Sequence, residues 1–270
     1  MTTNQNGILH GKTALIFGAG GAIGSTVATT FAREGATLFL SGRHIDSVNK
    51  IAEQIKSSGY DAASDLVDAV NEDKVNKYFE KVFKKTGKID IVFNAIGSRL
   101  DGAIHVMPST ETSLETFKMY LNNMVLSQFL TSRVAAKYMQ KQSKGSIVLM
   151  TATPSRGVAP FLPGACAGHA AIDGLARCLA LEFGAMGIRV NAVMSGGMQE
   201  TPNIQEVIKG MAKLVGAPVE ALMQQVKEKS ILKRTSTLKE TAEVVTFIAS
   251  DKASSITGAI INASCGEVLD

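Results

Sequence analysis

The chain has 270 residues, of which 45% are hydrophobic and 19% charged, and a formal net charge of +4, values that exclude a disordered chain. The lysines concentrate in one amphipathic run, 74–88, without aromatic residues on its polar side, so we expect a solvated helix face and no nucleic-acid partner. No apolar run reaches about 18 residues, and the three cysteines lack metal-ligand spacing, so we expect a cytoplasmic protein without a membrane span or metal site.

Short apolar runs alternate with longer segments of helical periodicity, which is typical of an α/β fold with a parallel sheet between helices. Six strands are predicted: TALIFGA at 13–19, ATLFLSG at 36–42, IDIVFNA at 89–95, GSIVLMTA at 145–152, IRVNAVMSG at 188–196 and AIINA at 259–263. The predicted helices are 22–34, 46–57, 71–85, 114–140, 164–184 and 238–249. No linker or repeat interrupts this pattern, so we predict a single Rossmann-type, doubly wound domain over residues 1–270.

The first predicted strand leads into a glycine-rich loop that opens the first helix. Glycine there permits a tight turn and close backbone approach, and the amides at a helix N-terminus bind phosphate. We therefore predict a dinucleotide site, with a purely structural turn as the weaker alternative. The residues expected to contact the cofactor are Gly18, Gly20, Gly21, Ile23 and Gly24.

The second predicted strand ends at Ser41-Gly42-Arg43, without the acidic residue that holds the ribose 2′-hydroxyl of NAD. A guanidinium at this point can pair with a 2′-phosphate. We therefore predict that Arg43 favours NADP(H), while NAD(H) stays possible. A solvated arginine at a strand end is the alternative.

Further motifs resemble those of the short-chain dehydrogenase/reductase superfamily over nearly the whole chain. Gly18 and Gly24 fit its GxxxGxG spacing, with Ala22 in place of the middle glycine. The other segments that resemble its motifs are Asp65-Leu66 (adenine recognition), NAIG at 94–97, IRVNAV at 188–193, Ser195-Gly196 in place of Pro-Gly, and Thr257-Gly258. The resemblance implies an NAD(P)-dependent oxidoreductase that assembles as a homodimer or homotetramer through helices 114–140 and 164–184. It adds, as cofactor contacts, Asp65, Leu66, Asn94, Ala95, Gly97, Thr151, His169, Gly196 and Met198.

The serine, tyrosine and lysine that members of this superfamily use for catalysis are all replaced. Aligning the chain on 170–175 and 181–182 places their positions at Ala152, Ala165 and His169. Alanine has no ionisable group, so the usual proton transfer to a carbonyl is excluded. His169 is the one candidate catalytic residue: its imidazole can bond a ribose hydroxyl or exchange a proton, and a structural helix histidine is the alternative.

A fourth position, an asparagine in the long helix of the superfamily, falls at Met124 in this alignment. Asn123 lies one residue away and would take the role if the helix register shifts. Segments 151–153, 156–157 and 164–171 resemble 2,4-dienoyl-CoA reductases, which also lack the serine and tyrosine but keep the lysine. We therefore expect reduction of an activated alkene or enoyl thioester. The alternative is a catalytically inactive dinucleotide-binding subunit or sensor.

Segment 196–233 is rich in methionine and aliphatic residues and follows the fifth predicted strand. We predict that it forms helices over the ligand crevice, as a lid with a lining suited to an apolar small molecule. Packing of these side chains against the core alone is an equal alternative.

Overall fold

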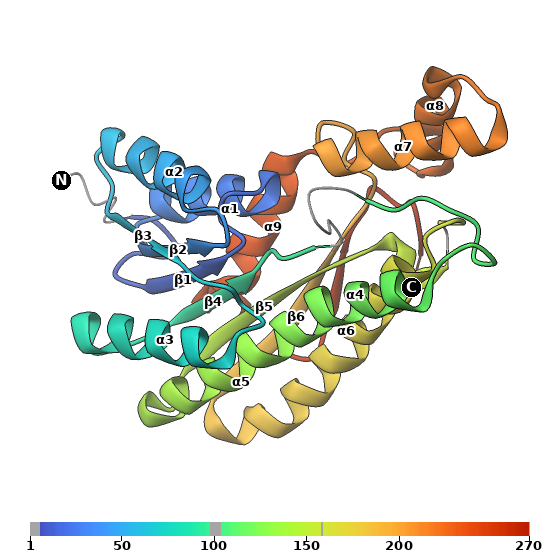
Figure 1. Ribbon diagram of the computed structural model, residues 1–270. Helices are drawn as coiled ribbons and strands as arrows, with labels where there is room; N and C mark the ends of the chain where they lie inside the picture. Colours follow the sequence, from blue (N-terminus) through green and yellow to red (C-terminus); the bar gives the residue numbers. More distant parts are fainter. Residues whose placement is uncertain (1–5, 98–103, 158, 270) are drawn as a thin grey trace.

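The computed structural model describes residues 6–97, 104–157 and 159–269 (Figure 1). Seven parallel strands form one sheet in the order β3-β2-β1-β4-β5-β6-β7, which confirms the predicted single-domain α/β fold. The strands are β1 (Thr13–Phe17), β2 (Thr37–Gly42), β3 (Ala62–Leu66), β4 (Ile91–Asn94), β5 (Gly145–Ala152), β6 (Ile188–Ser195) and β7 (Ile260–Ala263).

Helices cover both faces of the sheet, and two more lie beyond the ends of its strands (Figure 1). One face carries α1 (Ala22–Arg33), α2 (Ile45–Ser57) and α9 (Leu238–Ala249), and the other carries α3 (Glu72–Thr86), α4 (Leu114–Tyr120), α5 (Ser127–Met139) and α6 (Pro163–Phe183). The two helices at the strand ends, α7 (Pro202–Val215) and α8 (Val219–Lys229), fall inside segment 196–233.

The five inner strands, from β2 to β6 in the sheet order, are buried on both sides, which explains their continuous apolar runs. In β1, Leu15 and Phe17 belong to the core under α3, α5 and α6, whereas Ala14 and Ile16 belong to the core under α1, α2 and α9. Alternate residues of a strand point to opposite faces, so one apolar run supplies both cores.

The strand β3 is absent from the six that the sequence predicts. Its residues, AASDL, form no apolar run, and only Ala62 is fully buried. Backbone pairing with β2, in the register Leu40↔Ser64 and Ser41↔Asp65, defines this edge strand. Hydrogen bonding to a neighbour, which leaves no hydrophobic pattern, accounts for the missed element.

The predicted helix 114–140 is present but is not regular. A π-helical segment, Leu121–Leu126, separates α4 from α5. A π-helical turn inserts one extra residue into the helix and shifts the faces on either side of it. The segment therefore changes which residue of the long helix faces the carboxyl ends of the strands.

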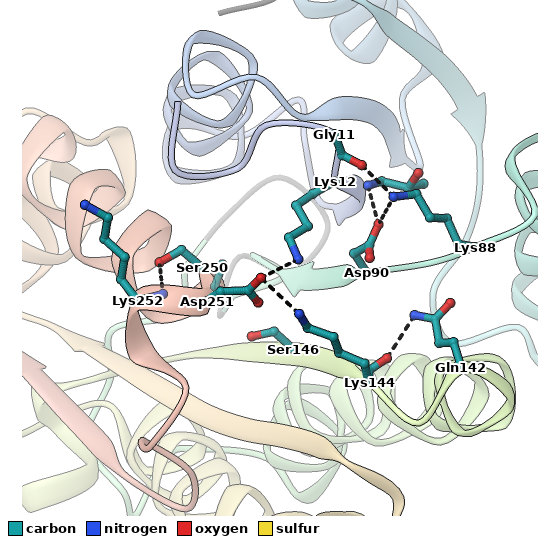
Figure 2. A network of polar contacts seen from close by, with 12 residues as sticks. Gly11, Lys12, Lys88, Asp90, Gln142, Lys144, Ser146, Ser250, Asp251 and Lys252 are labelled. Atoms are coloured by element: carbon teal, nitrogen blue, oxygen red, sulfur yellow. Dashed lines mark hydrogen bonds and ion pairs between the residues drawn. The ribbon is translucent and has the colours of Figure 1, made fainter. Parts of the chain in front are cut away.

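A network of ionic contacts ties loops together at the opposite, amino-terminal edge of the sheet (Figure 2). Asp251, after α9, accepts hydrogen bonds from Lys12, before β1, at 2.8 Å and from Lys144, before β5, at 3.0 Å. Asp90, before β4, accepts from the backbone amide of Thr13 at 2.8 Å and pairs with Lys88 at 3.2 Å. The contacts join the starts of β1, β4 and β5.

Within the described residues, no helix combines the length and hydropathy that crossing a membrane requires. The same part of the chain holds no group of three His, Cys, Asp or Glu side chains placed to bind a metal ion.

Candidate active site

A cavity of about 1250 Å³ lies where the loops after β1, β2, β4, β5 and β6 meet α7 and α8. Ligands of open α/β sheets bind at this edge, beyond the carboxyl ends of the strands. The residues predicted to contact a cofactor that line this cavity are Gly18, Gly20, Gly21, Ile23, Gly24, Arg43, Ala95, Gly97, Thr151, His169, Gly196 and Met198. The structure thus brings residues spread over 180 positions of sequence, from 18 to 198, into one site.

The glycine loop forms a close-fitting cradle at the start of α1. Gly18 has a φ of +74°, a conformation that favours glycine, and a Cβ on Gly24 would stand 2.2 Å from the Gly18 carbonyl oxygen. Gly21 is the N-cap of α1 and makes no side-chain cap, so the amides of the first turn stay available to a ligand. The loop therefore fits the pyrophosphate of a dinucleotide.

Two residues predicted to recognise adenine, Asp65 and Leu66, do not line the cavity. Asp65 forms an ion pair with Lys81 on α3, and Leu66 is 57% exposed. The chain reaches the cavity just after β3 ends, where Asp68 and Ala69 contribute to the lining. The lining in this part of the chain thus begins at Val67, directly after the two residues that the sequence predicts as contacts.

Asn94 also lies outside the cavity lining, beneath the turn that follows β4. Its side chain is fully buried, donates to Thr131 Oγ1 at 3.0 Å and accepts from the amide of Ile96 at 2.9 Å. These bonds fix the turn that places Ala95 and Gly97 at the cavity. Asn94 thus shapes the site from below rather than lining it.

The π-helical segment decides which residue of the long helix faces the site. Asn123 lines the cavity and donates from Nδ2 to the carbonyl oxygen of Gly97 at 3.1 Å. Met124, to which the ungapped alignment points, is fully buried in the core. The one-residue shift that the sequence leaves open is therefore present, and Asn123 is the polar group at this point.

The three residues that the sequence alignment assigns to the catalytic positions of the superfamily, Ala152, Ala165 and His169, all line the cavity. Ala152 ends β5, and the other two lie one turn apart on α6. The methyl groups of Ala152 and Ala165 cannot exchange a proton. No tyrosine is among the described residues that line the cavity.

His169 is the polar group left at these three positions. It is 8% exposed, and its Nδ1 has no hydrogen-bond partner within the described residues. Burial lowers the pKa of His169 to about 4, so the imidazole is neutral at neutral pH. A buried nitrogen without a partner is costly in a finished core, which marks it as a group open to a ligand.

Tyr120, whose ring lies against Gly164 of α6, does not supply a phenol to the cavity. Its hydroxyl accepts a hydrogen bond from the His105 amide at 3.0 Å, and the side chain is 2% exposed. Burial raises the pKa of Tyr120, which opposes a role as a proton carrier near neutral pH.

The wall of the cavity opposite α6 is largely apolar and comes from the two helices of segment 196–233. Ile204, Val207, Ile208 and Met211 line it from α7, and α8 adds Leu222 and Val226. These side chains face the cavity rather than only the core. An apolar wall of this kind favours hydrocarbon groups of a ligand.

Two polar residues that the sequence does not indicate meet at the cavity and bond to each other. Thr153 follows Ala152, and Glu267 comes from the C-terminal segment after β7; both line the cavity. The Thr153 hydroxyl donates to Glu267 Oε1 at 3.0 Å. No sequence signal indicates that residue 267 returns to the ends of β5 and β6, because the return follows from three-dimensional packing beyond the last strand.

Comparison with known proteins fits this geometry. A family model described as "Enoyl-(Acyl carrier protein) reductase" matches residues 18–267. The chain belongs to the short-chain dehydrogenase/reductase superfamily. An uncharacterized oxidoreductase of Thermotoga maritima is 34% identical over 95% of this chain and 97% of its own. A probable 2,4-dienoyl-CoA reductase of Caenorhabditis elegans is 28% identical over 97% of this chain and 82% of its own. The crystal structure of an NAD⁺-bound xylitol dehydrogenase superposes with a TM-score of 0.90 at 27% identity, covering 96% of this chain and 99% of that one.

Proposed function

We propose that this short-chain dehydrogenase/reductase is an NADP(H)-dependent oxidoreductase that reduces an activated carbon–carbon double bond, such as that of an enone or enoyl thioester, rather than a ketone. The observation that carries the proposal is the contrast inside one cavity. The cradle for a dinucleotide is intact, whereas Ala152 and Ala165 replace the groups that protonate a carbonyl oxygen. A site with this combination suits hydride transfer to carbon without a phenol.

The cofactor preference follows from the charges after β2. Arg43 is exposed and lines the cavity, and no acidic side chain pairs with it in the described ranges. A guanidinium in this place suits a 2′-phosphate, and the absence of an acid between Ser41 and His44 removes the group that would select NAD. NADPH is therefore the proposed cofactor, with NADH as a weaker ligand.

A reduced nicotinamide bound at the end of the cradle supplies the hydride. The chain's own groups then position the reactants. His169, neutral and without a partner at Nδ1, bonds a ribose hydroxyl, and Asn123 holds the Gly97 carbonyl at the same wall. With a pKa of about 4, His169 carries no proton to spare at neutral pH, so solvent is the source of the proton that the substrate carbon takes up.

The apolar wall of α7 and α8 serves as a lid over the hydrocarbon part of the substrate. Two names agree with this substrate class: the matching family is named after an enoyl reductase, and one relative is named as a probable dienoyl-CoA reductase. As in the superfamily at large, the proposed assembly is a homodimer or homotetramer.

Two measurements test the proposal. Calorimetric titration should show NADPH binding more tightly than NADH, and Arg43→Ala should reduce NADPH affinity while leaving NADH affinity nearly unchanged. A panel of enones and enoyl thioesters should then oxidise NADPH, whereas the corresponding saturated ketones should not. Turnover of ketones in preference to the alkenes would overturn the proposal.

A second function is favoured by one observation, the loss of all three catalytic groups from an otherwise intact site. A non-catalytic dinucleotide-binding subunit or sensor retains the cradle and needs no proton donor. It predicts NADPH binding without oxidation of the cofactor by any member of the panel. The panel therefore separates the two functions.

A further inference from the structure

The side chain of Glu267 lines the cavity near the ends of β5 and β6. Its Oε1 accepts a hydrogen bond from the Thr153 hydroxyl at 3.0 Å, and its Oε2 accepts one from the backbone amide of Gly197 at 2.9 Å. Thr153 directly follows Ala152, and Gly197 lies in the loop after β6. The carboxylate is therefore held beside the positions where the superfamily carries its catalytic groups.

Both hydrogen-bond donors to Glu267 are neutral. In the part of the chain that the structure describes, no lysine, arginine or histidine forms an ion pair with this carboxylate. A carboxylate offers about four acceptor positions, and the two bonds use one on each oxygen. The remaining lone pairs belong to a side chain that lines the cavity. Glu267 thus keeps acceptor capacity available to a ligand.

We propose that Glu267 recognises the substrate by accepting a hydrogen bond from a hydroxyl or ammonium group on an otherwise apolar molecule. The apolar wall, represented by Val207 on α7 and Val226 on α8, contacts the hydrocarbon part. Hydrogen bonds to an ionised acceptor are worth more than neutral ones, and a negative charge repels ligands that carry a carboxylate of their own. The inference rests on the proposed function only for the assignment of the cavity to a substrate.

A purely structural role for Glu267, tying the C-terminal segment to the loops after β5 and β6, makes a different prediction. Glu267→Gln keeps the size of the side chain, can accept from Gly197 and can share a hydrogen bond with Thr153, but it removes the charge. If Glu267 is only a structural tie, this variant should keep both the thermal stability of the native chain and its choice between ligands, because both hydrogen bonds are kept. If Glu267 is a recognition group, the variant should lose that choice.

The test is calorimetric titration with three probes that share one hydrocarbon chain: octylamine, octanol and octanoate. The native chain should bind octylamine at least about tenfold more tightly than octanoate, with octanol between them. Glu267→Gln should lose this preference. Glu53→Gln, which removes an exposed carboxylate of α2 outside the cavity lining, should retain it.

Lys229 of α8 also lines the cavity, and its positive charge would favour the opposite ligand, octanoate. Equal or tighter binding of octanoate by the native chain would show that the lysine, and not Glu267, sets the charge preference. A preference that survives Glu267→Gln would reduce the carboxylate to a structural tie. Should Glu267→Gln fail to fold, Thr153→Val removes one donor that orients the carboxylate and should narrow the preference.

Each titration is run with and without NADPH, so that this inference and the proposed function can fail separately. Preference for octylamine in a chain that does not bind NADPH would leave Glu267 as a recognition group and remove the oxidoreductase. If the chain binds NADPH and reduces enones but binds the three probes equally, the oxidoreductase stands and Glu267 is not a recognition group.

Discussion

The low pKa of His169 makes the free energy of unfolding depend on pH. Its pKa is about 4 in the folded chain, against about 6.5 in an unfolded one, so the unfolded state binds more protons between these values. Stability is therefore complete above about pH 6.5 and falls as the pH decreases toward 4. We expect the native chain to lose about 2 kcal/mol between about pH 7.5 and about pH 5 through this residue. Urea unfolding at the two pH values measures the loss.

The matched control is His169→Gln, which keeps a polar side chain of similar size without a titrating group. Its free energy of unfolding should change by about 2 kcal/mol less over the same interval. Equal pH dependence in the two chains would mean that the pKa of His169 is the same in the folded and the unfolded chain. NADPH should also protect the native chain, because a ligand that binds only the folded state stabilises it.

Restoring the missing groups tests how much of the usual mechanism the fold still supports. Ala152→Ser, Ala165→Tyr and His169→Lys together place a hydroxyl, a phenol and an ammonium at positions that already line the cavity. The ammonium lowers the pKa of the phenol, so the triple variant should gain ketone reduction by about 100-fold over the native chain. The rate at which a β-keto thioester oxidises NADPH measures this gain in ketone reduction.

The control for that gain is the same triple variant with phenylalanine in place of tyrosine at residue 165. It has the added bulk and charge but no phenolic proton, so it should stay at the native rate. If both triple variants gain alike, the added lysine improves cofactor binding and the phenol contributes nothing.

The phosphate loop makes a prediction that belongs to the turn between β1 and α1. A methyl group at residue 24 would stand 2.2 Å from the carbonyl oxygen of Gly18, which is backbone and cannot yield cheaply. Gly24→Ala should therefore displace the start of α1 and lower NADPH affinity by at least about tenfold. Gly21→Ala meets the same oxygen at 3.4 Å, an ordinary contact, and should keep most of the affinity. Calorimetry on the two variants compares them directly.

The helices and strands show which parts of the fold the sequence predicts and why others escape it. Helix α9 and the buried strands were predicted closely because continuous apolar runs and helical periodicity record burial directly. The edge strand β3 and the register of Asp65 were missed, since both depend on pairing with β2. No local pattern in the sequence predicts the π-helical segment or the hydrogen bond that Asn123, within it, donates to Gly97.

One network of ionic contacts lies at the edge of the sheet opposite the cavity. The cavity lies at the carboxyl ends of the strands, whereas the contacts of Asp251 with Lys12 and Lys144 lie at the amino ends (Figure 2). The hydrogen bond from Lys12 makes the largest contribution to lowering the pKa of Asp251. The ion pairs of Asp251 therefore stabilise the fold fully at pH values above the ordinary pKa of an aspartate. This stabilisation is lost as the pH falls through the lowered pKa of Asp251.

Because the side chain of Asp251 is 56% exposed, solvent and salt screen these pairs. Asp251→Asn should lower the free energy of unfolding by about 1 kcal/mol at low ionic strength and by clearly less in about 1 M salt. NADPH affinity should stay at the native value, since the substitution lies at the far edge of the sheet. The control is Glu243→Gln, which breaks an exposed ion pair with Lys239 within α9, 3.8 Å long. An equal loss of unfolding free energy in this variant would show that the position of Asp251 between three loops contributes no extra stability. A loss of NADPH affinity in Asp251→Asn would show instead that the two edges of the sheet are coupled.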